Sequence, residues 1–226
     1  MKKGKLLSLL LAAVVGAGSL AMTAQAAPAE LPAQTAKTAA FVKASDWVLK
    51  DDWAIFALGR NQEEGCEKLY EDYYQGVLAL LADPAKLIPS DYIRLSLSLT
   101  AIGIDPRNVE GNDLLEKIDQ ADREMYFKMS TSSLAYALAL MERYPDSFSG
   151  TLKEDTIQKI LGAQQADGSF DYTVGGGYPD PDSTAQAMQG LMLLGDTYAS
   201  EIQAAVDWLK AQMNEDGAIL NWGAAN

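Results

Sequence analysis

Histidine is absent from this chain, and cysteine occurs once, as Cys66, among 226 residues. Without histidine the chain cannot form a histidine-ligated zinc site or a catalytic site of the Ser-His-Asp or Cys-His type. A single cysteine also excludes a disulfide within one chain. No neighbour of Cys66 in the sequence indicates an activated thiol, so we expect a structural cysteine. Any acid–base chemistry must therefore use Asp, Glu, Tyr or Lys.

Basic residues are also few. Lys and Arg together number 18 against 31 Asp and Glu, which gives a net charge of −13. Because affinity for the phosphate backbone comes largely from Lys and Arg, we expect no nucleic-acid partner. The hydrophobic fraction of 48% is typical of a globular protein and excludes a disordered chain. We predict no cofactor and no metal site.

The first 26 residues have the pattern of an export signal. Lysines at positions 2, 3 and 5 precede an apolar or small run from Leu6 to Met22, and Ala24-Gln25-Ala26 has the small-x-small pattern that signal peptidase reads. We expect cleavage after Ala26 and a secreted or cell-surface protein. The alternative is that this segment remains as a membrane anchor. No later segment approaches the length of a membrane span, so we expect none in the mature chain.

The remaining sequence predicts an all-α protein. After a linker over residues 27–35, residues 36–226 form one predicted domain in which apolar residues recur at helical spacing. Alternation typical of strands is hard to find, and about nine helices are expected. Their expected ranges are 36–50, 52–58, 67–82, 91–102, 112–118, 132–143, 151–165, 183–195 and 200–213.

Three helix starts carry the pattern of a capping box, in which a Ser or Thr and a Glu or Gln three residues later satisfy each other's backbone N–H groups. The pairs are Thr151 with Glu154, Ser183 with Gln186, and Ser200 with Gln203. Each is followed by apolar residues at helical spacing, so we expect each pair to begin its helix.

The predicted helices alternate in character along the chain. One set is small and aliphatic nearly all round, which indicates burial on more than one face: residues 52–59, 92–103, 133–141 and 184–195. The other set is amphipathic with a charged side and belongs outside: residues 67–82, 112–118, 151–165 and 201–213. Successive inner helices are about 40 to 50 residues apart, a period at which helical hairpins stack into a curved array.

The turns after two outer helices are the most specific feature. Gln164, Gly168 and Phe170 lie in the first, and Gln212 and Gly217 lie in the second. Asp-Gly favours a turn with positive φ, and the aromatic residue is expected to fold back onto the hairpin. The second copy has one extra residue and an isoleucine in place of the aromatic.

The first turn resembles the Q-x3-G-x-W repeat of the terpene-cyclase and protein-prenyltransferase α/α-toroid superfamily. The stretch Asp180-Pro181-Asp182-Ser183-Thr184-Ala185 is similar to the D-x-D-D-T-A segment of squalene-hopene cyclases. Exported bacterial toroid-repeat proteins of unassigned activity are similar in character. The resemblance implies an α/α toroid, a partial barrel of inner and outer helical hairpins. The four recognisable hairpins imply an incomplete ring, because the chain is truncated or because further domains or a partner complete it.

The resemblance to cyclases implies that Asp182, preceded by Asp180, is the acid that protonates an alkene. Ser183 stands where the family has its last Asp, and a helper histidine is impossible. Such an acid must stay neutral in a dry pocket, whereas the start of a helix favours the carboxylate. The alternative interpretation is that Pro181, Asp182 and Ser183 only start and cap a helix. Protein-prenyltransferase activity is excluded by the lack of histidine.

The loop over residues 167–182 faces the mouth of the implied toroid, and Tyr172, Tyr178 and Asp171 are its candidate ligand-contacting residues. Its acids suit calcium in type but do not have EF-hand spacing, and a solvated mobile loop is the commoner explanation. We expect a non-catalytic module that binds a small molecule, a glycan or a protein partner. The alternative is a terpene-cyclase-like enzyme that uses an Asp acid on an isoprenoid.

Overall fold

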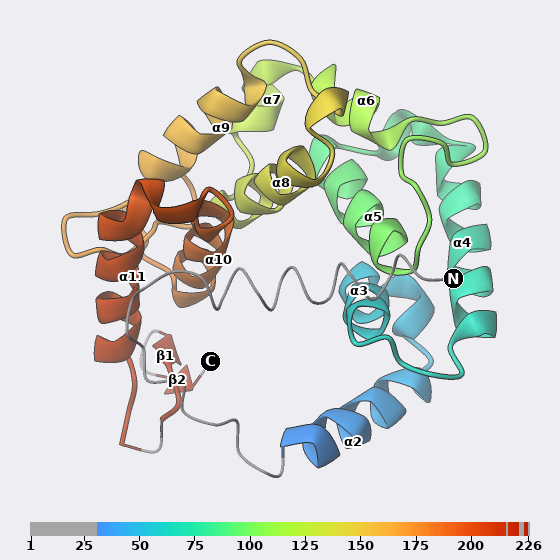
Figure 1. Cartoon of the computed structure of the whole chain (residues 1–226), viewed down its shortest axis with the longest axis horizontal. Helices are drawn as coiled ribbons and strands as arrows, with labels where there is room; N and C mark the ends of the chain where they lie inside the picture. Colours follow the sequence, from blue (N-terminus) through green and yellow to red (C-terminus); the bar gives the residue numbers. More distant parts are fainter. Residues whose placement is uncertain (1–30, 216, 222–223, 226) are drawn as a thin grey trace. The chain divides into compact units, whose positions relative to one another are not determined.

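The computed structural model describes residues 31–215, 217–221 and 224–225 (Figure 1). The export signal therefore lies outside the described residues, as do the first residues of the expected linker. Within the described range the chain forms two compact units, which meet in sequence at Leu114 and Leu115. We describe each unit by itself.

Among the residues that the structure describes, the first unit contains four α-helices and two short 3-10 helices. In order these are α2 (Leu31–Lys43), η1 (Val48–Lys50), α3 (Asp52–Arg60), α4 (Glu67–Leu81), η2 (Pro84–Lys86) and α5 (Pro89–Ala101). Helix α3 packs against α5, and η1 contacts both α3 and α4. The approach of α3 to α5 depends on Gly59, because a Cβ there would lie 2.8 Å from the backbone carbonyl of Ala101. Buried Ile55, Ile93 and Leu99 fill the space between these helices.

The expected helix over residues 36–50 is wrong in its bounds. Helix α2 begins at Leu31, inside the expected linker, and ends at Lys43. The Ser45 hydroxyl then donates to the Phe41 carbonyl at 2.8 Å, the type of local bond with which serine competes against helix continuation. The Asp51 carboxylate accepts from the N–H groups of Trp53 and Ala54 and so begins α3 as a separate helix.

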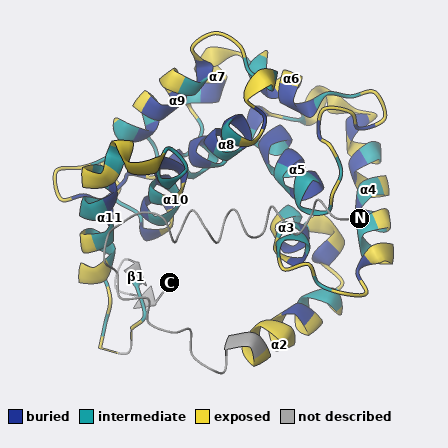
Figure 2. Ribbon diagram, in the orientation of Figure 1, coloured by how far each residue is buried: buried dark blue, intermediate teal, exposed yellow. Residues whose placement is uncertain are grey.

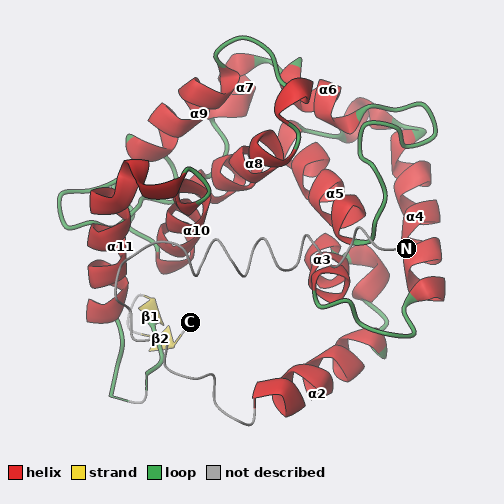
Figure 3. Ribbon diagram, viewed as in Figure 1, coloured by secondary structure: helices red, strands yellow, loops and turns green. Residues whose placement is uncertain are grey.

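The second unit contains the remaining helices and two very short strands (Figure 3). The elements are α6 (Leu114–Asp119, which begins at the boundary), α7 (Arg123–Phe127), α8 (Thr131–Arg143), η3 (Pro145–Ser147), α9 (Leu152–Leu161), α10 (Pro181–Met192), η4 (Gly195–Tyr198), α11 (Ala199–Ala211), β1 (Leu220–Asn221) and β2 (Ala224–Ala225). The strands pair antiparallel, Leu220 with Ala225 and Asn221 with Ala224. Across the described residues the structure is mostly helical, so the all-α prediction is confirmed.

Helices α8 and α10 form the middle of the second unit. They pack against each other, while α9 packs on α8 and α11 packs on α10. Close contact of the middle pair depends on Gly190, where a Cβ would lie 3.1 Å from the Cβ of Ala135. Helix α8 is buried on more than one face, as its small and aliphatic sequence predicts, whereas α11 buries only Ile202 and Ala205 (Figure 2).

Two of the three expected capping boxes do not form, although α9 begins directly after Thr151 as predicted. At the start of α9 the Thr151 hydroxyl donates to the Asp155 carboxylate at 2.6 Å and caps no backbone N–H. Helix α11 begins before Ser200, whose hydroxyl donates to Glu201 at 2.7 Å. A capping hydroxyl must point its oxygen at a backbone N–H, and here the bond to a carboxylate orients the side chain differently.

The third expected box is wrong in its position. Helix α10 begins two residues before Ser183, with Asp180 as its N-cap and Pro181 in its first turn. The Asp180 carboxylate accepts the Ser183 N–H at 2.7 Å. Asp before Pro is the stronger start signal, since Asp caps well and Pro needs no N–H partner at the first helical position.

Other boundaries moved for local reasons. Helix α6 begins at Leu114 instead of residue 112, because Val109 and Asn112 form a tight bridge with N–H to O distances of 2.8 and 3.0 Å. Helix α9 ends at Leu161, before the expected end at residue 165. The short helix α7 was not predicted from the sequence. No helix among the described residues is long and apolar enough to cross a membrane.

Candidate functional site

The turn after α9 is a closed structure built by the repeat residues. Gln165 donates its N–H to Ser169 O at 2.8 Å, and Gly168 donates to Gln165 O at 3.0 Å. Gln164 and Phe170 pair across the turn in an antiparallel bridge. Gly168 has φ of +94°, a conformation that favours glycine, and Phe170 is fully buried as expected. The prediction of a positive-φ turn with an inward aromatic is confirmed.

The same turn occurs again 49 positions later, after α11. Asn214 donates to Ala218 O at 2.9 Å, Gly217 donates to Asn214 O at 3.0 Å with φ of +83°, and Met213 pairs with Ile219. The geometric equivalent of the glutamine at position 164 is thus Met213. Gln212 lies one position earlier, at the end of α11, where its amide donates to Trp208 O at 3.4 Å. The extra residue of the second copy is therefore explained by its glutamine lying outside the turn.

The first turn is bound to α11, which follows α10 in the chain. The Gln164 amide donates to Gly168 O at 3.2 Å and to Glu201 O at 2.9 Å. A Cβ on Gly168 would lie 2.4 Å from the Ala204 carbonyl oxygen, so only glycine permits this approach. The repeat residues of this turn thus hold helices together and expose no chemistry to a ligand.

Asp167 strengthens the same junction. Its carboxylate accepts from the Ser169 hydroxyl at 2.7 Å, from the Ser169 N–H at 3.0 Å and from the Trp208 indole N–H at 3.2 Å. These hydrogen bonds, that of the Ser169 hydroxyl first, lower the pKa of Asp167. The acid is therefore a structural acceptor for the turn.

The segment over residues 171–180, which we call the tyrosine loop, leaves the body of the unit as a short antiparallel ribbon. Asp171 pairs with Pro179, and the next residues along the ribbon are joined by a bond from Tyr172 N to Tyr178 O at 3.0 Å. Opposed residues of an antiparallel ribbon point to one face, and their neighbours point to the other. The two tyrosines therefore share the outer face, with 57% of Tyr172 and 63% of Tyr178 exposed.

Asp171 does not lie on a ligand-contacting rim, contrary to expectation, because it is fully buried. One carboxylate oxygen, Oδ2, accepts from the Gln165 amide at 2.8 Å and from the Gly177 N–H at 2.9 Å. Its other oxygen, Oδ1, is buried with no hydrogen-bond partner. The alternation of the ribbon explains the inward position, since Asp171 belongs to the face opposite the tyrosines.

The tyrosine loop is attached to the N-terminal ends of both middle helices. On the α8 side, Thr131 donates its N–H to Tyr172 O at 2.8 Å and its hydroxyl to Asp171 O at 2.7 Å. On the α10 side, Thr184 accepts the Phe170 N–H at 2.9 Å. These bonds fix the backbone that carries the exposed tyrosines.

The candidate acids lie beside this loop at the start of α10. Asp180 is half-buried and serves as the N-cap, while Asp182 is exposed in the first turn. Asp182 lies near Tyr136 of α8, where burial first and this carboxylate second raise the pKa of the phenol. The hydroxyls of Ser132 and Ser183 are 3.3 Å apart and connect the two helix starts. The structure thus brings Asp182, Tyr172 and Tyr178 to one end of the unit but does not enclose Asp182.

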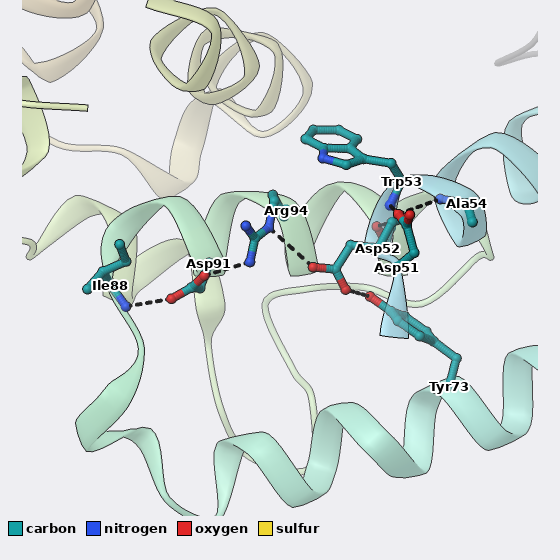
Figure 4. A network of polar contacts seen from close by, with 9 residues as sticks. Asp51, Asp52, Trp53, Ala54, Tyr73, Ile88, Asp91 and Arg94 are labelled. Carbon is teal, nitrogen blue, oxygen red and sulfur yellow. Dashed lines mark hydrogen bonds and ion pairs between the residues drawn. The ribbon is translucent and has the colours of Figure 1, made fainter. Parts of the chain in front are cut away.

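The first unit contains a polar network that sequence reasoning missed (Figure 4). Asp52 of α3 accepts from the Tyr73 hydroxyl of α4 at 2.8 Å and from Arg94 Nε of α5 at 3.3 Å. Arg94 also pairs with Asp91 at 2.6 Å, and Asp91 accepts the Ile88 N–H at 2.9 Å at the start of α5. The only signal in the sequence is the Asp91–Arg94 spacing of three residues on a predicted helix.

This network is structural because each carboxylate oxygen already has a partner. Both oxygens of Asp52 and of Asp91 are occupied by groups from the same unit. Burial, followed by the charge of Asp52, raises the pKa of Tyr73 well above its usual range, so its hydroxyl stays protonated and acts as a donor. The network joins α3, α4 and α5, and the carboxylate oxygens of Asp52 and Asp91 are all engaged within it.

Two other candidate features of the chain are Cys66 and groups of possible metal ligands. Cys66 is buried, as expected of a structural thiol. Among the residues with described positions, no three Asp, Glu or Cys side chains are grouped to hold a metal ion.

Comparison of the chain with protein-family profiles, with curated proteins and with solved structures found no match.

Proposed function

We propose that this chain is an exported helical-repeat module that binds a ligand or a partner through its tyrosine loop without chemical turnover. The observation that carries the proposal is the pair of exposed tyrosines on a loop whose backbone is bonded to the starts of α8 and α10. Large exposed aromatic side chains on a fixed scaffold are typical of binding surfaces. Rigid placement lowers the entropy that binding must overcome.

The proposed architecture is a partial α/α toroid. It is supported by the resemblance of the first turn to the toroid repeat and by the recurrence of helix, helix and turn within the second unit. Stacked helical repeats bury their faces against neighbouring repeats. A partner or further repeats that complete the ring belong to the same proposal, and so does export through the signal over residues 1–26.

The exposure of Asp182 favours binding over catalysis. An acid that protonates an alkene must remain neutral, which requires a sheltered and dry environment. Asp182 is exposed at a helix start, Asp180 is engaged as an N-cap, and Asp171 lies inside the loop. We therefore propose no cyclase chemistry for this site.

The experiment pairs a binding screen with an activity test. Ligand-observed NMR would use methyl α-glucoside, tetramethylammonium and short peptides on the parent chain and on the Tyr172→Ala/Tyr178→Ala double variant. Phe41→Ala, which removes a ring that is 67% exposed in the other unit, is the matched control. We expect at least one probe to bind the parent and Phe41→Ala but not the double variant. Equal binding to all three proteins contradicts the proposal.

The activity test uses squalene and geranylgeranyl diphosphate, with product analysis by mass spectrometry. We expect no cyclic product. A cyclic product that disappears in Asp182→Asn would replace the proposal with the cyclase alternative.

A further inference from the structure

The sequence that includes the tyrosine loop is acidic and contains no basic residue. Residues 163–184 include four Asp, at positions 167, 171, 180 and 182, and no Lys or Arg. Of these, Asp182 is exposed and lies in the same end of the unit as the two tyrosines. The stretch of chain that carries the rings is therefore matched to a cation rather than to an anion.

The buried Asp171 adds an independent observation. It forms no ion pair among the described residues, and its Oδ2 is bonded only to neutral donors, the Gln165 amide and the Gly177 N–H. Its Oδ1 is buried without a partner. Gly177 adjoins Tyr178 and Asp171 adjoins Tyr172 in the sequence, so this acid without an ion pair lies beside the backbone that carries both rings. An acid in a low-dielectric interior acts on nearby charges more strongly than one in water.

The two exposed rings lie on the outer side of the ribbon. Gly176 brings the loop backbone against one ring, since a Cβ there would lie 3.7 Å from Cδ2 of Tyr178. The face of a tyrosine ring is electron-rich and attracts cations. The exposed rings and the nearby acid without an ion pair thus both favour a cationic group.

We propose that the tyrosine loop binds arginine side chains of a basic polypeptide partner, stacked on Tyr172 and Tyr178 and attracted by Asp171 and Asp182. This inference rests on the proposed binding function and names its partner class. A guanidinium group is planar, stacks on aromatic rings and pairs with carboxylates, which a compact ammonium group does less well. The net charge of −13 adds long-range attraction for a basic polypeptide. A protruding loop with outward rings is suited to side chains displayed on another surface.

The test is an NMR titration of the full chain carrying ¹³C-labelled tyrosine rings. The probe is the peptide acetyl-Gly-Arg-Gly-Arg-Gly-amide, compared with the same peptide carrying Lys or Glu and with methyl α-glucoside. We expect the Arg peptide to shift the rings of Tyr172 and Tyr178 and to bind more tightly than the Lys peptide. The Glu peptide and the sugar should leave these rings unshifted, and added salt should weaken the Arg peptide.

Variants assign the binding to rings and charge. Tyr172→Ala and Tyr178→Ala should each weaken binding of the Arg peptide roughly threefold or more. Tyr172→Phe keeps the ring face, so its affinity for the Arg peptide should be within about twofold of the parent's. Asp171→Asn should weaken it a few-fold, whereas Asp207→Asn, at an exposed acid of α11, should not. Circular dichroism would check that each variant is folded.

Each other outcome is decisive. Ring shifts with the sugar or the Glu peptide but not with the Arg peptide would overturn this inference and leave the binding function standing. If no probe shifts either ring, both proposals fail. Equal weakening by Asp171→Asn and Asp207→Asn would overturn the role of the buried acid, because net charge alone would then account for binding.

Discussion

The two copies of the repeat turn offer a matched pair of substitutions. Gly168 and Gly217 occupy equivalent positions, with φ of +94° and +83°, but only the first is covered by a helix. A Cβ on Gly168 would lie 2.4 Å from the Ala204 carbonyl oxygen, whereas among the described residues one on Gly217 would meet only the Cε of Met213, at 3.8 Å. Gly217→Ala therefore isolates the backbone strain, and Gly168→Ala adds the clash with α11.

The strain alone should cost about 1 kcal/mol, since a residue with a Cβ is disfavoured by about 1–2 kcal/mol in this conformation and alanine reduces the freedom of the unfolded chain. For Gly168→Ala the turn and α11 must also separate by about 1 Å, which brings 2.4 Å to an ordinary contact of 3.4 Å. That movement weakens the bonds from Gln164 to Glu201 and from Trp208 to Asp167. Overpacking should cost about 1 kcal/mol, and each of the two weakened bonds about 1 kcal/mol more. Together with the strain of about 1 kcal/mol, we expect a total of about 4 kcal/mol.

The assay is urea unfolding followed by circular dichroism at 222 nm, with hydrogen exchange of residues 199–211 to locate the effect. With an m-value of about 2 kcal/mol per M, Gly168→Ala should lower the midpoint by about 2 M and Gly217→Ala by about 0.5 M. Exchange in α11 should rise only in Gly168→Ala. Equal midpoints for the two variants would refute the reasoning, because the contact with Ala204 would then carry no energy.

Three further predictions follow from individual contacts. Asp52→Asn should lower the free energy of unfolding by about 1–2 kcal/mol, because its new amide faces Arg94, and a double-mutant cycle with Arg94→Ala should be non-additive; additivity would contradict the pairing. Since the pKa of Asp167 is lowered in the fold, its contribution is present above the unfolded value near 3.8 and is lost as pH falls below it. Ser169→Ala should therefore reduce the urea midpoint at pH 6 but hardly at pH 2.5, and an equal loss at both would contradict this origin. Intact mass of the exported protein should show removal of residues 1–26, and a retained segment would favour the anchor.

Helical periodicity and composition were sufficient to predict the fold class and the burial of α8 on more than one face. The pattern of α8, small and aliphatic all round, matches its burial between α9 and α10. This worked because burial on several faces requires apolar residues at every turn of the helix, which one sequence displays directly. The positive-φ turn at Gly168 was predicted for a similar reason, since it depends only on nearby residues.

The capping hydrogen bonds were predicted less well than the helix starts, because a hydroxyl can bind more than one neighbour. Thr151 and Ser200 have the right spacing for capping boxes, but Asp155 and Glu201 take their hydroxyls. A spacing rule does not include a nearby carboxylate that can bind the hydroxyl and orient it away from the backbone N–H. The Asp52–Arg94 pair escaped prediction for a different reason, because its members are 42 positions apart.

The tyrosine loop shows how the pairing register determines which side chains of a ribbon face outward. In the sequence, Asp171, Tyr172 and Tyr178 form one polar and aromatic group, and all three were assigned to a ligand-contacting rim. The bridge from Asp171 to Pro179 places the acid on the inner face and the tyrosines on the outer face. A shift of the ribbon by one residue would reverse this, because successive side chains alternate between faces. The assignment of aromatic rings to contact and of the acid to support therefore depends on a register that composition does not contain.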